Sequence, residues 1–120
     1  MLELTLLTLN LFGQAASADT PSMQFTNRTG VKVTVRIFCE QHQQLANNGK
    51  ELEVGAGATV KLALHEGYFK VSAVNDDQQT AGARRVLKTG ELDWLDFSGI
   101  YGDPPGRRPV QKFRITEHKL

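Results

Sequence analysis

The sequence has 120 residues, of which 40% are hydrophobic and 22% are charged, and its formal net charge is +1. A chain of this length and composition forms one globular domain around a single hydrophobic core. The near-neutral charge argues against a dedicated nucleic-acid-binding protein, which carries a strong basic excess. The one cysteine, Cys39, excludes an internal disulfide and a zinc site built from several cysteines.

Residues 1–18 have the features of a secretory signal peptide. The apolar run 4–12 is followed by Ala16-Ser17-Ala18, which places small residues where signal peptidase cuts. The run is too short to cross a bilayer as a helix, so we expect no stable membrane span. We therefore expect cleavage after Ala18, a single domain over residues 19–120, and a secreted or periplasmic location. The alternative is an N-terminal strand, because leucines alternate with polar residues in this run and no Lys or Arg precedes it.

The clearest strand is formed by residues 31–39, in which β-branched and other apolar residues alternate with mostly polar ones. A period of two predicts a strand with one face in the core. Residues 23–26 form a shorter strand before it, and residues 27–30 are expected to join the two as a hairpin turn. Cys39 falls on the apolar face, so we interpret it as a small buried hydrophobic residue and not as a reactive thiol.

Further short alternating segments follow, separated by turns rich in glycine and asparagine, and none has a helical period. This pattern predicts an all-β fold, a small antiparallel β-sandwich of immunoglobulin-like or transthyretin-like type with about seven or eight short strands. The segments are 50–54, 59–64, 68–74, 83–88, 91–97 and 110–116. The side chains expected in the core are Val33, Val35, Ile37, Val60, Leu62, Phe69, Val71, Trp94 and Phe113.

The order of strand and turn residues resembles that of several small β-sandwich families. The resemblance is carried by Phe25-x-Asn27-Arg28-Thr29-Gly30, by the alternating strand after it, by residues 55–64 and by Gly67-Tyr68-x-x-Val71. It is similar to the β domain of the von Hippel–Lindau family, and equally to carboxypeptidase-regulatory and transthyretin-like modules. The likeness covers about half of the chain. It implies a sandwich architecture and assigns no functional residue.

One short motif bears on modification. Asn27-Arg28-Thr29 matches the N-x-T acceptor of N-linked glycosylation. A secreted eukaryotic chain could carry a glycan in this turn, whereas in a bacterial chain the motif has no such meaning.

Motifs for catalysis, for a metal or for a cofactor are not evident. The three histidines, His42, His65 and His118, lie in separate polar stretches without the spacing of a metal site. The G-x-S-x-G motif is missing, and the acidic pair 76–77 lacks the pattern of a calcium loop. We therefore expect no catalytic residue, no metal and no cofactor, and favour a protein that is not an enzyme. A hydrolase with an unrecognised site is an alternative, which a histidine beside Cys39 or two convergent carboxylates would favour.

The irregular segment 98–109, rich in glycine and proline, is the predicted binding surface. Loops on a rigid scaffold often carry binding function, and tyrosine and arginine are frequent interface anchors. We expect a non-catalytic module that binds a protein or a glycan through its end loops. The alternative is a structural or assembly subunit that pairs through its N-terminal strand. The predicted binding residues are Tyr101, Arg107, Arg108, Arg84 and Arg85.

Overall fold

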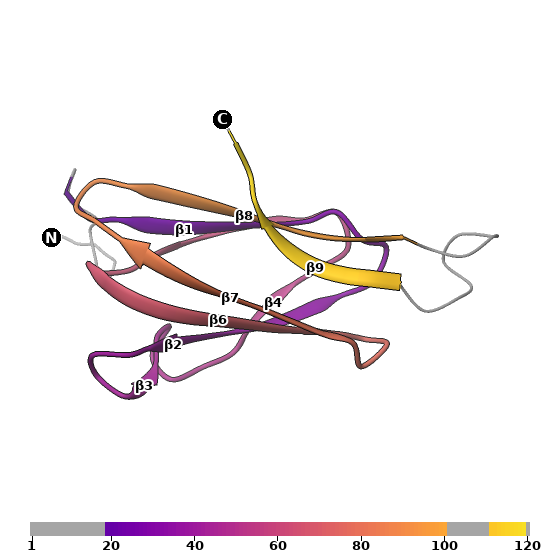
Figure 1. The fold of residues 1–120 in the computed structure, drawn as a ribbon, viewed down its shortest axis with the longest axis horizontal. Helices are drawn as coiled ribbons and strands as arrows, with labels where there is room; N and C mark the ends of the chain where they lie inside the picture. The colour runs from indigo at the N-terminus through magenta and orange to yellow at the C-terminus, as the bar shows by residue number, and fades with distance from the viewer. Residues whose placement is uncertain (1–18, 101–110, 120) are drawn as a thin grey trace, which may run out of the picture.

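The computed structural model describes residues 19–100 and 111–119. Over these residues the protein is all-β, with nine strands arranged in two sheets that form a sandwich (Figure 1). The predicted all-β, sandwich-like architecture is therefore confirmed. In the described ranges, no helix is long and apolar enough to cross a membrane. Residues 1–18 and the loop residues Tyr101, Arg107 and Arg108 lie outside the described part of the chain, so the expectations for them stay predictions.

The first sheet has the strand order β5-β1-β8-β9. β1 pairs antiparallel with β5 but parallel with β8, so the wholly antiparallel pairing that we expected is wrong for this sheet. A parallel neighbour requires a long connection between the two strands, and here that connection runs through the second sheet. The strands are β1 (Ser22–Asn27), β5 (Thr59–Ala63), β8 (Leu92–Ile100) and β9 (Gln111–Glu117).

The second sheet has the order β3-β2-β6-β7, and all of its neighbours are antiparallel. A further strand, β4 (Leu52–Val54), pairs with the first residues of β2, while β3 pairs with the last residues of β2. The central strands are thus β2 and β6, and β7 forms one edge. Their bounds are β2 (Val33–Cys39), β3 (Gln44–Leu45), β6 (Gly67–Asn75) and β7 (Thr80–Leu87).

The turn at residues 27–30 connects the two sheets, and the expected hairpin between the first two strands is therefore wrong. β1 belongs to the first sheet and β2 to the second. Each strand has one apolar face, and placing the strands in opposite sheets directs both faces into one core. Phe25 and Val33 are accordingly fully buried.

The buried side chain of Asn27 holds this crossover together. Its amide nitrogen donates to the backbone carbonyls of Val31, at 2.7 Å, and of Val54, at 3.0 Å. Its amide oxygen accepts hydrogen bonds from the backbone N–H and the hydroxyl of Thr29, at 2.9 and 2.6 Å. Both hydrogens of the amide nitrogen are therefore used inside the folded domain, so a glycan on this nitrogen would disrupt the crossover.

The core lies between the sheets and is filled by alternate residues of both. Within it, the rings of Phe25 and Phe97 stack with their centroids 5.6 Å apart.

Trp94 is not in the core as expected: the inward positions of β8 are taken by Leu95 and Phe97. Trp94 is half-buried, donates its indole N–H to the Thr26 hydroxyl at 2.8 Å, and packs against the ring of His118. Five of the other expected core residues are buried: Val33, Val35, Ile37, Phe69 and Val71. The remaining three pack at the margin of the core: Val60, Leu62 and Phe113.

Ion pairs connect the two sheets on one side of the sandwich, where β7 of the second sheet lies beside β9 of the first (Figure 1). Arg85 donates to both carboxylate oxygens of Asp93, at 2.7 and 2.8 Å, and lies 3.2 Å from a carboxylate oxygen of Glu117. The hydrogen bonds to Asp93 raise the pKa of Arg85 above its ordinary value, so the guanidinium stays charged. The Asp93 side chain is only 7% exposed and depends on this partner.

We expect Asn27→Ala to lower the free energy of unfolding by about 2–4 kcal/mol, because four hydrogen bonds are lost and the Val54 carbonyl and the Thr29 N–H lose their bonds to the buried Asn27 amide. Chemical denaturation of both proteins measures the difference. Gln24→Ala is the control, since Gln24 lies in the same strand but is only half-buried. An effect of Asn27→Ala no larger than that of the control would contradict the role given to Asn27.

We expect Arg85→Met to destabilise the domain by about 1–3 kcal/mol, because it leaves the Asp93 carboxylate buried without its cation. The double variant Arg85→Met, Asp93→Leu should recover most of the loss, since the uncompensated charge is then removed. A double-mutant cycle measured by denaturant unfolding tests this. If the effects of the two single substitutions simply add, the stabilising interaction between Arg85 and Asp93 is refuted.

Candidate metal centre

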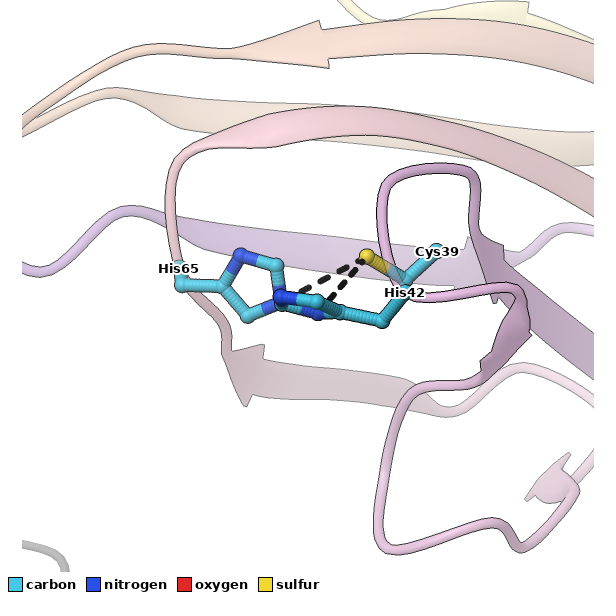
Figure 2. Close-up of side chains that lie close together, drawn as sticks. All are labelled: Cys39, His42 and His65. Atoms are coloured by element: carbon cyan, nitrogen blue, oxygen red, sulfur yellow. Dashed lines mark hydrogen bonds between the residues drawn. The ribbon is translucent and has the colours of Figure 1, made fainter.

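Cys39, His42 and His65 come together at the end of the sandwich where β2 ends (Figure 2). The Cys39 Sγ lies 3.4 Å from Nδ1 of His42 and 3.7 Å from Nε2 of His65. All three donor atoms lie within 4.8 Å of one another. In the described part of the chain, one thiol and two imidazoles thus face a common point.

Each of the three residues is placed by a different local feature. Cys39 is the last inward-facing residue of β2 and is only 2% exposed, so its predicted burial is confirmed. His42 lies in the turn after β2, where Gln43 adopts a left-handed backbone with φ of 53°. His65 lies between β5 and β6, and its ring packs against Phe69 with the centroids 5.3 Å apart. The cluster thus joins the end of β2 to the connection that leads from β5 of the first sheet to β6, the neighbour of β2 in the second.

A backbone contact fixes the protonation pattern of the His65 ring. Its Nδ1 lies 2.7 Å from the carbonyl oxygen of Glu66, and a ring nitrogen at this distance from a carbonyl must carry a hydrogen and donate it. In the neutral ring Nε2 is then unprotonated, and its lone pair faces the sulfur of Cys39. A metal-binding histidine is typically held in this way, with one nitrogen bonded to a carbonyl and the other free to coordinate.

The two S···N separations are close to those of a metal site. Zinc binds sulfur at about 2.3 Å and imidazole nitrogen at about 2.0–2.1 Å, so a tetrahedral ion requires S···N separations of about 3.6 Å. The two observed S···N separations, 3.4 and 3.7 Å, lie on either side of this value. Thiolate and imidazole together suit zinc and copper.

A hollow of about 560 Å³ opens beside the cluster, between β5 and the β3 region. Both histidines line it, together with apolar side chains such as Leu45, Leu62 and Leu64. The two imidazoles are exposed, whereas the sulfur-bearing residue behind them is buried. An ion from solution can therefore reach the donors from the side of the histidines.

The predicted binding arginines of β7 are not brought to this cluster. Arg84 pairs with Glu40, with a shortest N···O distance of 2.9 Å, and Arg85 pairs with Asp93. Neighbouring residues of a strand point to opposite faces, so the two guanidiniums diverge. With Tyr101, Arg107 and Arg108 they stay predicted binding residues.

Sequence reasoning missed the cluster because it considered metal spacing among the histidines alone and paired Cys39 with a histidine only as a possible nucleophile. The available signal was Cys39-x-x-His42, in which two ligands lie three residues apart at a strand end. The third donor, His65, is 26 positions from Cys39 and is brought there by the pairing of the strands. That pairing was not predicted.

No family profile matches the sequence, and no curated protein matches it. Among solved structures, the chain is similar to a protein from Eubacterium rectale determined by NMR, with a TM-score of 0.55 and 10% sequence identity. The match covers 90% of this chain and 97% of that chain. At this identity the likeness shows a shared fold and carries no information about function.

Proposed function

We propose that this protein is a metal-binding β-sandwich module, which holds one transition-metal ion through Cys39, His42 and His65. The observation that carries the proposal is the convergence of these three donors within 4.8 Å of one another, with both S···N separations close to those around a tetrahedral ion. The proposal keeps the expected class, a secreted or periplasmic non-catalytic binding module, and gives it a metal ion as ligand. Recognition of a protein or glycan through residues 98–109, and an immunoglobulin-like or transthyretin-like affiliation, remain predictions within it.

A bound ion would link two segments that are far apart in the sequence. Cys39 and His42 belong to the end of β2 and the turn after it, whereas His65 lies in the connection between β5 and β6. Because the unfolded chain does not hold these donors together, binding stabilises the folded state by mass action. An ion at one hundred times its Kd adds about 2.7 kcal/mol.

A hydrolase with a cysteine nucleophile is the second candidate, and the 3.4 Å separation between Cys39 and His42 favours it. A histidine beside Cys39 is one of the two features that the sequence analysis gave as favouring this alternative, the other being two convergent carboxylates. Two features weigh against it. Cys39 is only 2% exposed, and imidazoles occupy the space beside the sulfur that an attacked carbonyl would need. We therefore favour metal binding.

Titration of the metal-free protein with Co²⁺ tests the proposal. We expect one equivalent to bind, with visible absorption typical of tetrahedral cobalt and a thiolate-to-cobalt charge-transfer band that Zn²⁺ abolishes by displacement. Cys39→Ala should remove the charge-transfer band. His42→Ala and His65→Ala should each weaken binding by more than the roughly 10–100-fold that loss of an outer-shell partner costs.

His118→Ala is the matched control, because His118 pairs with Asp96 at 3.1 Å and lies outside the cluster. It should leave the titration unchanged. Cobalt binding that survives Cys39→Ala, or that falls equally in His118→Ala, would overturn the proposal.

Alkylation of Cys39 separates the metal site from the nucleophile. A metal ligand is expected to react slowly with iodoacetamide and to be protected further by stoichiometric Zn²⁺, because the ion occupies the sulfur lone pairs. Mass spectrometry of the intact protein over time measures both rates. Rapid alkylation that requires His42 and is indifferent to Zn²⁺ would support the hydrolase instead.

A further inference from the structure

The sulfur of Cys39 has a further polar neighbour, the side-chain amide of Gln41. Its Oε1 lies 3.6 Å from Sγ, and the thiol donates to it. The same oxygen accepts the backbone N–H of Tyr68 at 3.0 Å. This second bond settles the orientation of the amide, because only the oxygen end can accept a hydrogen bond from an N–H group.

The amide of Gln41 occupies space that only a glycine leaves free. A β-carbon at Gly67 would lie 2.6 Å from Nε2, 2.8 Å from Oε1 and 2.9 Å from Cδ of Gln41. Gly67 also has a φ of 150°, which side-chain-bearing residues rarely adopt. The amide is thus held between the backbone of Gly67, the N–H of Tyr68 and the sulfur.

When the His65 ring is neutral, the hydrogen bonds around the sulfur do not balance in the absence of an ion. Oε1 of Gln41 accepts from Tyr68, and Nε2 of the neutral His65 ring is an acceptor because its Nδ1 donates to Glu66. Both face one thiol, which has a single hydrogen to donate. One acceptor therefore faces the sulfur lone pairs without a hydrogen between them, whereas a cation at the centre would satisfy every lone pair together.

We infer that Oε1 of Gln41 is the fourth ligand of the metal ion and completes a closed centre of one sulfur, two nitrogens and one oxygen. Zinc binds oxygen at about 2.0–2.2 Å, so a tetrahedral ion requires an S···O separation of about 3.6 Å. The observed separation is 3.6 Å. The inference rests on the proposed function, because it assigns a further ligand to the same site.

Two consequences follow from a fourth protein ligand. When the ion binds, it replaces the thiol hydrogen that Gln41 accepts, and one proton leaves to solvent as the thiolate forms. A site with four protein ligands also has no position for water or substrate, as in structural zinc sites, whereas catalytic sites keep one position open. The centre therefore holds its ion and does not use it as a Lewis acid.

The test uses the full chain loaded with Co²⁺ and challenged with azide. The wild-type spectrum should not respond, because no position is open. Gln41→Ala should bind Co²⁺ about tenfold more weakly and should respond to azide, because a water replaces the amide. Gln41→Glu should restore a closed, unresponsive centre, since a carboxylate oxygen can coordinate in place of the amide.

Two further variants test whether the azide response depends on the position of the Gln41 amide. Gly67→Ala keeps the glutamine but displaces its amide, and it should reproduce the azide response of Gln41→Ala. Gln44→Ala is the matched control, because Gln44 lies in β3 of the same region and lines the hollow. It should behave as wild type.

The outcomes for this inference and for the proposed function are distinct. If the wild-type protein fails to bind Co²⁺ with a thiolate charge-transfer band, the proposed function itself is wrong. If it binds with that band but responds to azide, or if Gln41→Ala matches wild type in affinity and spectrum, the metal site stands and the fourth ligand is overturned.

Discussion

The inward face of β2 is the constraint on which the rest of the structure depends. Val33, Val35, Ile37 and Cys39 alternate along it, and each is at most 2% exposed. A slip of one residue would turn all four outward and the polar residues inward, so the register with β6 is strongly specified. That register places Cys39 opposite Phe69 and fixes the sulfur at the end of the core. Core packing therefore determines the position of the Cys39 sulfur in the site.

A sandwich also has two open sides, where the edge strands of its sheets face each other. On the side of β7 and β9, Arg85 and Asp93 close the gap with a partly buried ion pair. Near β3 and β5 the chain instead leaves a hollow, with the Cys39 cluster beside it. A metal ion held there would connect the end of β2 to the connection between β5 and β6, whereas on the other side the guanidinium of β7 connects the second sheet to carboxylates of the first.

The sequence predicted the sandwich because alternation is a local property of each strand. It could not predict which strands pair. The turn after β1 has hairpin chemistry, yet Asn27 uses its side chain to reach Val54, a contact with a residue 27 positions away. Alternation likewise defines two faces of β8 without saying which one is buried, and for that reason Trp94 was wrongly assigned to the core. The burial of Cys39 was predictable from its own strand, whereas its contact with His65 depends on the unpredicted topology.

Packing alone does not account for the surroundings of Cys39. A valine or an alanine would fill the last inward position of β2 without facing polar acceptors. The chain instead accepts a left-handed backbone at Gln43, which costs about 1–2 kcal/mol. It also has a glycine, Gly67, as the first residue of β6, where φ is 150°. These features let the turn place His42 and let Gln41 approach the sulfur. One bound cation would give all of them a common physical reason, because each brings a donor atom to the same point.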